Sequence, residues 1–276
     1  MTITCIIASR NPAHCQDLIT QLHSYNHTVI IVHPTATIAP NDVISITTAT
    51  LVSPAHARNL GAAHCTTELL CFLDDDVDLM GDVPRMLAMV FVAPHIVACG
   101  AVIHDHPHND SWHRAFHRMA MAPQHQSSAR RIPSILTSMA LMVRRSVFMA
   151  VGGFDTTFTQ PAGEDADLSL RLHRHGVIMT LPQARIHHLL QPAGWRGVTL
   201  RSWRYGTVWP QVRRHNPHAT TRLPCPNLVS AILITLIAPG LALVDTARTR
   251  RSGYWVRRWW LRTWWYLGVA WGMWHD

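Results

Sequence analysis

Apolar runs alternate with helix-like segments along the first part of the chain. Strands are predicted at residues 3–8, 28–33, 43–46 and 69–73, and helices at 15–23 and 54–64. Short apolar runs are typical of buried strands, and longer mixed segments are typical of helices. Their alternation predicts an α/β fold, with a mixed, mainly parallel, Rossmann-like sheet in an α/β/α sandwich. Ligands of such sheets bind at the carboxyl ends of the strands.

The pattern is less regular beyond residue 80. It predicts a helix at 83–92, a strand at 96–102, a strand-like or buried segment at 136–143, a helix that stops at Gly152-Gly153, and a helix from 164 to 175. Gly176 follows the last of these helices, where glycine is a common C-cap. The His-rich stretch from residue 104 to about 133 is expected to be irregular.

Three consecutive acids, Asp74, Asp75 and Asp76, follow the apolar run at 69–73. Carboxylates crowded at the end of a strand repel one another unless positive charge lies between them. A hard divalent cation such as Mg²⁺ or Mn²⁺ provides that charge and leaves coordination positions for phosphates. A solvated turn or a helix N-cap would also explain acids here. The apolar strand that runs directly into them favours a metal–phosphate site.

A second acidic pair, Glu164 and Asp165, follows Gly163 at the start of a predicted helix. One explanation is local, because acids in the first turn of a helix interact favourably with its dipole. The other is chemical, because a carboxylate close to a phosphate-bound metal is well placed to take a proton from a hydroxyl nucleophile.

Four sequence motifs together resemble the family 2 glycosyltransferases with the GT-A fold. They are His56-Ala57-Arg58-Asn59-Leu60-Gly61-Ala62-Ala63, Phe72-Leu73-Asp74-Asp75-Asp76, Gly152-Gly153-Phe154-Asp155 and Gly163-Glu164-Asp165. They occur in the family's order and spacing across about residues 1–190. The resemblance implies transfer of a sugar from a nucleotide-diphosphate donor to a hydroxyl acceptor, usually with inversion, in the synthesis of a cell-surface glycan or glycolipid.

The resemblance also implies roles for single residues. Asp74 and Asp76 match the family's DxD pair, so Asp76 is expected to bind Mn²⁺ or Mg²⁺ and Asp74 the donor ribose or a metal-bound water. Asp165 matches the catalytic base, with Glu164 beside it. Donor-binding positions are expected at Ala8, Arg10, Arg58, Asp74 and Asp75.

Other positions are less fully matched to the family. Gly153 and Phe154 are expected on the acceptor side. His187 or His188 is the candidate for a further metal ligand, with a structural histidine as the alternative. Many relatives carry, at the end of the second strand, an acid that binds the base or ribose. His33 stands in that region here, so the nucleobase is not predicted.

Five histidines lie close together between the predicted strand at 96–102 and residue 133. They are His104, His106, His108, His113 and His117. Zinc binding is one interpretation, but the chain has 20 histidines and its sequence contains no compact HExxH motif. A polar loop beside the acceptor cleft is the favoured interpretation.

The net charge is +8, and all 24 basic residues are arginine. Arginine binds phosphate groups bidentately, which suits nucleotides, nucleic acids and anionic lipids alike. The arginines become dense toward the C-terminus, which favours a membrane surface over nucleic acid. The six cysteines form no CxxC pair, and the N-terminus leads directly into a predicted strand. A reducing cytoplasmic location is therefore expected.

The composition changes after about residue 217, which predicts a catalytic domain at 1–217 and a helical, Trp- and Arg-rich region at 218–276. Residues 228–244 are apolar but interrupted by Pro239-Gly240, and residues 254–265 are a mixture rich in Trp and Arg. A full crossing by 228–244 would place the following arginines outside, against the positive-inside tendency. We therefore expect an in-plane or re-entrant helical pair on the cytoplasmic face of the plasma membrane. A helical hairpin packed on the domain or on a dimer partner is the alternative.

Two other functions fit parts of the sequence. A nucleotidyltransferase also uses an α/β sheet and acids, but the first strand ends in Ala8-Ser9-Arg10 without a Gly-rich loop. A non-catalytic nucleotide-sugar-binding module would keep the fold but would not need both acid motifs. The presence of both motifs in this chain therefore argues against such a module.

Overall fold

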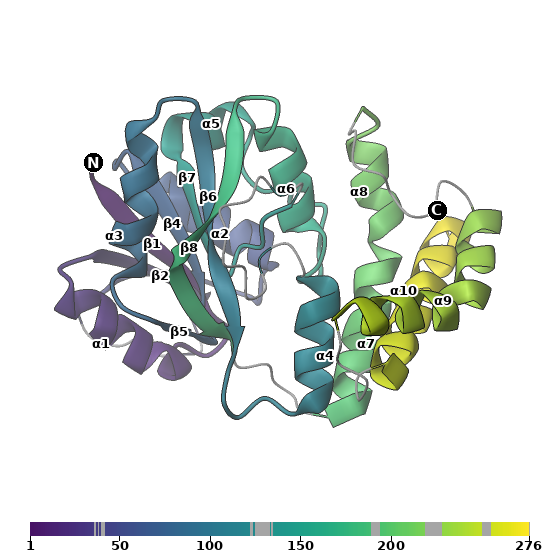
Figure 1. Ribbon diagram of the computed structural model, residues 1–276. Coiled ribbons are helices and arrows are strands. Elements are labelled where there is room, and N and C mark those ends of the chain that lie inside the picture. Colours follow the sequence, from purple (N-terminus) through teal and green to yellow (C-terminus); the bar gives the residue numbers. More distant parts are fainter. Residues whose placement is uncertain are drawn as a thin grey trace. The chain divides into compact units, whose positions relative to one another are not determined.

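The computed structural model of the chain describes residues 1–35, 37, 39, 42–121, 124, 133, 135–188, 194–218, 228–249 and 255–275 (Figure 1). Two compact units make up the chain. The first contains residues 1–104 and 123–189, and the second contains residues 105–122 and 190–276.

The first unit is built on a mixed sheet that has eight strands within the described residues, in the order β3-β2-β1-β4-β7-β6-β8-β5. The strands are β1 Ile3–Ala8, β2 Thr28–Pro34, β3 Ile44–Thr48, β4 Leu69–Asp74, β5 Val77–Leu79, β6 Ile96–Asp105, β7 Ala140–Arg144 and β8 Val177–His188. β1 pairs in parallel with β2 and β4, and β2 pairs in parallel with β3. β7 is antiparallel to β4 and β6, and β5 is antiparallel to β8. The predicted α/β fold with a mixed sheet is confirmed.

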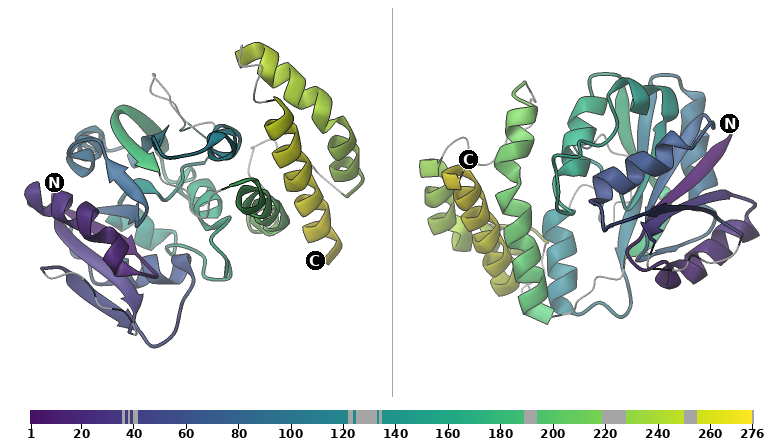
Figure 2. Two further views of the ribbon diagram at one scale, coloured as in Figure 1. Left: turned by 90° about the horizontal axis from the view of Figure 1, so that it is seen from below. Right: turned by 180° about the vertical axis from the view of Figure 1, so that it is seen from behind.

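Helices cover both faces of this sheet. They are η1 Pro12–Cys15, α1 Gln16–Ser24, α2 Pro54–Ala63, α3 Val83–Ala88, η2 Met89–Val92, α5 Arg145–Ala150 and α6 Glu164–Leu172. α1 and α3 lie on one face and α2 on the other (Figures 1 and 2). Gly61 brings α2 close to the sheet, because a Cβ there would collide with the side chain of Ile6. The helices therefore hold the strand ends in fixed positions.

The parallel pairing of β1 with β4 positions the predicted site. Ala8 is the register partner of Asp74, so the carboxyl ends of the two strands lie side by side. The acid triplet therefore lies at the same edge of the sheet as the Ala8-Ser9-Arg10 segment.

Two local predictions were wrong. The His-rich stretch contains α4 (Ser111–Ala120), because Asp110 accepts hydrogen bonds from Trp112 N–H and His113 N–H, and His113 completes a capping box. Gly176 is not the C-cap of α6, which ends at Leu172 with His173 as its cap. Glycine is needed at residue 176 because a Cβ would approach the carbonyl oxygen of His95 to 2.5 Å.

The second unit is helical. Its described helices are α4, α7 Gly194–Thr207, α8 Trp209–His215, α9 Leu228–Thr249 and α10 Trp255–His275. α10 packs against α4, α7, α8 and α9. This compact unit therefore includes helices that precede residue 217, and the domain boundary predicted there stays a prediction.

Three glycines allow α7 and α10 to approach closely. A Cβ on Gly206 would collide with the backbone of α10, and a Cβ on Gly268 or Gly272 would collide with the backbone of α7. Polar contacts join the same helices, since Ser202 Oγ donates to Leu261 O at 2.7 Å and Trp260 Nε1 donates to Thr199 Oγ1 at 2.7 Å. The tail is thus held to α7 by specific backbone and side-chain contacts.

The helices in the described ranges include none that combines the length and the apolar character needed to span a membrane. α9 nevertheless exposes a set of large aliphatic side chains: Val229, Ile232, Leu233, Leu236, Ile237, Leu243 and Val244. The predicted association of the tail with a membrane surface stays a prediction.

Candidate active site

Arg58 joins the two acid motifs. It lies on α2 and is only 4% exposed. Its Nη2 donates to Asp74 Oδ1 at 2.7 Å, and its Nη1 donates to Glu164 Oε1 at 3.0 Å. Burial opposes the charged form, but the two carboxylates outweigh it and raise the pKa of Arg58. A permanent positive charge therefore lies between the end of β4 and the start of α6.

Asp165, the predicted base, lies next to this ion pair and is partly exposed. The backbone N–H of Ala166 donates to its Oδ1 at 2.8 Å. Desolvation, and then the negative charge of Glu164, raise the pKa of Asp165 to about 7, while Arg58 lowers it. A carboxylate that titrates near neutral pH is suited to general base catalysis, because it both accepts and releases a proton readily.

Glu164 differs from Asp165 in its surroundings. It is buried, and burial raises the pKa of its carboxyl group while the charge of Arg58 opposes that effect. Its Oε1 is bonded to Arg58, and within the described residues its buried Oε2 has no hydrogen-bond partner. The structure therefore assigns Glu164 to an internal ion pair and leaves Asp165 as the more accessible acid.

Asp75 is held by the end of β1. Ser9 Oγ donates to Asp75 Oδ2 at 2.5 Å, and Ser9 Oγ also accepts from Asn11 N–H at 3.1 Å. Burial raises the pKa of Asp75 to about 6, against the hydrogen bond from Ser9, and Asp76 and Asp74 add to the rise. Arg10 follows on the exposed side of this segment. Among the predicted donor-binding residues, Ala8, Asp74 and Asp75 thus lie together, and Ser9 is an additional contact.

Asp76 lies against His188. His188 Nε2 is 3.2 Å from Asp76 Oδ2. The β5–β8 register places His187 opposite Asp78, and its ring lies edge-on to that of His104 with the centroids 6.2 Å apart. Adjacent residues of a strand point to opposite faces, so the side chains of His187 and His188 leave β8 on opposite sides.

The donor set at Asp76 suits a divalent cation. A carboxylate oxygen and an imidazole nitrogen are both accepted by Mn²⁺, and diphosphate oxygens are the usual source of further ligands. No group of three or more His, Cys, Asp and Glu side chains that could hold a metal ion by itself occurs in the described part of the chain, the described histidines of the His-rich stretch included. The residues present fit an ion shared with a phosphate-bearing ligand.

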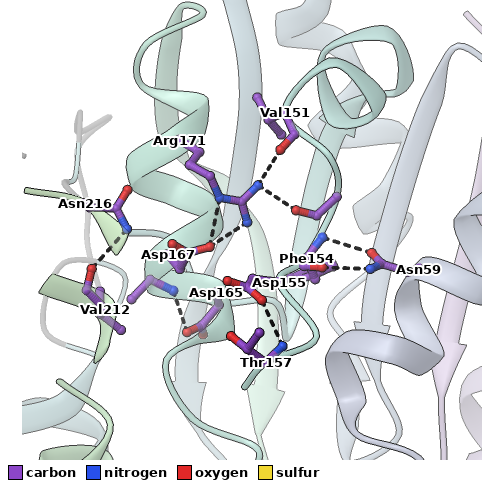
Figure 3. Close-up of polar contacts among 12 residues, drawn as sticks. Asn59, Val151, Phe154, Asp155, Thr157, Asp165, Asp167, Arg171, Val212 and Asn216 are labelled. Atoms are coloured by element: carbon purple, nitrogen blue, oxygen red, sulfur yellow. Dashed lines mark hydrogen bonds and ion pairs between the residues drawn. The ribbon is translucent and has the colours of Figure 1, made fainter. Parts of the chain in front are cut away.

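The Gly-Gly-Phe-Asp turn is fixed to α2 and α6 by polar contacts (Figure 3). Asn59 Oδ1 accepts from Phe154 N–H at 2.9 Å, and Asn59 Nδ2 donates to Phe154 O at 2.7 Å. Arg171 on α6 donates to the carbonyl oxygens of Val151 and Gly153, both at 2.7 Å, and pairs with Asp167. The turn is therefore tied to α2, which carries Arg58, and to α6, which begins with Glu164 and Asp165.

Phe154 forms part of the core beneath Arg58. Its side chain is 1% exposed, its ring meets that of Phe72 edge-on, and Arg58 Cζ lies 5.3 Å from its centroid. Gly153 has φ of 70°, and a Cβ there would come within 2.7 Å of Asn59 Oδ1. The acceptor-side role predicted for these two residues stays a prediction.

His33, near the end of β2, makes its contacts within the protein itself. Its Nδ1 lies 2.8 Å from Thr37 Oγ1 and 2.9 Å from Pro34 O, and its Nε2 lies 2.7 Å from Ser45 Oγ. Both ring nitrogens are thus engaged within the β2–β3 region.

The mixed α/β sheet, with acids at the end of β4 and at the start of α6, has the architecture of the GT-A fold. The sequence model described as Glycosyl transferase family 2 matches residues 14–152. The chain belongs to this family.

Relatives and fold neighbours agree with this assignment. The chain is 30% identical over 200 residues to the pre-mycofactocin glycosyltransferase of two Mycobacterium tuberculosis strains, CDC 1551 / Oshkosh and ATCC 25618 / H37Rv. These matches cover 68% of this chain and 41% of those proteins, so the chain spans less than half the length of the curated relatives.

Two solved structures share the fold at low sequence identity. The mannosyltransferase PcManGT from Pyrobaculum calidifontis, in complex with GDP-Man and Mn²⁺, has a TM-score of 0.65 and 15% identity, covering 99% of this chain and 87% of that one. GalNAc-T7 with UDP, GalNAc and Mn²⁺ has a TM-score of 0.54 and 12% identity, covering 82% and 59% respectively.

Proposed function

We propose that this chain transfers a glycosyl group from a nucleotide-diphosphate sugar to a hydroxyl acceptor, with inversion at the anomeric carbon. Family membership supports the reaction class. The observation that carries the proposal is the ion pair of Arg58 with Asp74 and Glu164, because it brings the donor-side acids of β4 next to the base candidate of α6.

In the proposed reaction Asp165 acts on the acceptor. Its carboxylate takes the proton of the acceptor hydroxyl while the hydroxyl oxygen forms a bond to the anomeric carbon. The bond from that carbon to the diphosphate oxygen breaks, and the nucleoside diphosphate leaves with the bonding electron pair. Attack from the face opposite the diphosphate inverts the configuration. A pKa of about 7 allows Asp165 to be ionised in the ground state and to accept a proton in the transition state.

Asp76 and His188 would hold a divalent cation, Mn²⁺ or Mg²⁺, together with phosphate oxygens of the donor. Such an ion supplies positive charge beside the departing diphosphate. Asp74 is bonded to Arg58 and Asp75 to Ser9, so each carboxylate of the triplet has a different protein partner. Asp76 is the one whose partner, an imidazole, is itself a common metal ligand.

The second unit would place the enzyme on a membrane surface, at the cytoplasmic face of the plasma membrane, where lipid-linked or cell-surface glycans are accessible as acceptors. The exposed aliphatic side chains of α9 support this proposal, because a helix with an exposed apolar face binds in the interfacial region of a bilayer. The net charge of +8 adds attraction to anionic lipid headgroups.

The products distinguish the proposed reaction from the alternatives. Purified chain is incubated with Mn²⁺, a panel of nucleotide sugars and a panel of hydroxyl acceptors. Glycosyl transfer releases a nucleoside diphosphate and produces a glycosylated acceptor, whereas nucleotidyl transfer from a nucleoside triphosphate releases pyrophosphate. Binding of a nucleotide sugar with no product across the panel would contradict the proposal and favour a binding module.

A further inference from the structure

Arg58 and Asn59 are consecutive residues of α2 that reach three separate parts of the first unit. Arg58 is 16 residues from Asp74 and 106 residues from Glu164, and Asn59 is 95 residues from Phe154. Their contacts therefore connect segments that the chain itself does not keep together. We infer that Arg58 and Asn59 are positioning residues, which set the placement of Asp74 and Asp165 relative to each other without contacting the substrates.

The geometry of Arg58 supports a positioning role over direct contact with the donor. Both terminal nitrogens already bond to protein carboxylates, and the side chain is 5% exposed. Its position above the Phe154 ring also leaves one face of the guanidinium against the core. The burial of the side chain leaves a phosphate or nucleobase little access to these nitrogens.

The charges around Arg58 explain why the position matters. Asp74, Glu164 and Asp165 interact electrostatically with one another, and each pair of carboxylates is repulsive. A single planar cation that donates to two of them lets the strand end and the helix start approach. Lysine has one ammonium group on a flexible chain, so it keeps the charge but does not reproduce the fork.

Asn59 fixes the position of the Gly-Gly-Phe-Asp turn, as Arg58 fixes the positions of the acids. Its side-chain amide forms two hydrogen bonds with the backbone of Phe154, and Arg58 lies over the ring of the same residue. α2 is itself held on the sheet by buried Ala55, Ala57 and Ala62. The helix thus acts as one rigid support for β4, the turn and α6.

Arg144 offers a matched control. It is also an arginine of the first unit that bonds to the protein, since it donates to the carbonyl oxygens of Ile96, Phe91 and Ala93. It pairs in register with Leu69, at the opposite end of β4 from Asp74. The variant Arg144→Lys tests the loss of a structural arginine away from the acids.

The inference rests on the proposed function and is tested by steady-state kinetics on full-length Arg58→Lys, Asn59→Ser and Arg144→Lys, with donor affinity measured separately by calorimetry. We expect Arg58→Lys to lower kcat about 10- to 100-fold with donor Kd changed less than about threefold, because a misplacement of about 1 Å can cost that much in rate. Asn59→Ser should act in the same direction, and Arg144→Lys should lower the melting temperature while leaving kcat unchanged.

Arg58→Ala with added guanidinium ion provides a second measurement. Partial recovery of kcat at millimolar guanidinium, and not at equal concentrations of NaCl, is expected for a positioning cation.

Equal losses of donor affinity and of kcat/KM in Arg58→Lys would overturn the inference, because Arg58 would then contact the donor. Equal loss of kcat in Arg144→Lys would also overturn it. A wild-type chain that transfers no sugar removes the proposed function and this inference together, whereas an active wild type with an unaffected Arg58→Lys removes the inference alone.

Discussion

His188 Nε2 lies 3.2 Å from Asp76 Oδ2, so the end of β8 meets the acid triplet that follows β4. The two residues are 112 positions apart in the numbering, and no local feature of the sequence distinguishes His188 from its neighbour His187. Their contact defines the part of the site at which a divalent cation is proposed.

His188→Gln and Asp76→Asn are expected to weaken Mn²⁺ binding in the presence of UDP or GDP by about tenfold or more, because each removes one ligand of the proposed site. The measurement is the Mn²⁺ concentration that gives half of the maximal thermal shift. His187→Gln is the matched control and should keep the wild-type value. An equal loss in His187→Gln and His188→Gln would contradict the assignment.

Asp165→Asn is expected to lower kcat by about 10²- to 10⁴-fold while donor affinity stays close to wild type, because the amide cannot accept the acceptor proton. Asp17→Asn, an exposed acid on α1, is the control and should retain full activity. Turnover in Asp165→Asn equal to that of wild type would show that another group is the base.

The pH dependence of kcat/KM should have an acid limb near pH 7. Asp165 has its pKa raised to about 7 by desolvation and by Glu164, and only the ionised carboxylate is a base, so activity falls as pH drops below this value. Rates measured from pH 5.5 to 9 with constant ionic strength locate the limb. A limb centred near pH 4, the ordinary range of an aspartate, would contradict the environment described for Asp165.

Leu236→Asp is expected to weaken binding to phosphatidylglycerol-containing vesicles by about tenfold or more, because it removes apolar surface whose burial contributes about 1.5–3 kcal/mol. Leu236 on α9 is 72% exposed. Val92→Asp is matched to it, since Val92 is 78% exposed but belongs to the first unit. Cosedimentation that is lost equally in both variants, or that is undetectable for wild type, would argue against α9 as the membrane-binding surface.

Gly268→Val is expected to destabilise the second unit by about 1–3 kcal/mol, because the added side chain overfills the close contact between α10 and α7. Gly240→Ala on α9 is the control: no described residue lies within 4 Å of a Cβ there, and alanine is the better helix former. Thermal unfolding followed by circular dichroism compares the two. A melting temperature unchanged in Gly268→Val would contradict the close packing of these helices.

Much of the sheet was predictable because its strands are marked by local patterns. The apolar runs at 3–8 and 69–73 correspond to β1 and β4, and the Gly163-Glu164-Asp165 motif begins α6 as expected. α4 was missed because the stretch was judged by its many histidines, while the signal for its start was the acid Asp110 three residues before His113. Gly176 was misassigned because its need for glycine comes from His95, a contact that no local pattern records.

The sequence by itself determined the family, the acid motifs and the alternation of strands and helices up to β4, because these depend on residue types at short spacing. Only the tertiary structure decided which partners those acids have. Arg58 bonds to carboxylates 16 and 106 residues away, and His188 meets Asp76 across 112 positions of the chain. Such choices depend on how distant segments are packed and aligned, which short-range patterns in a chain do not encode.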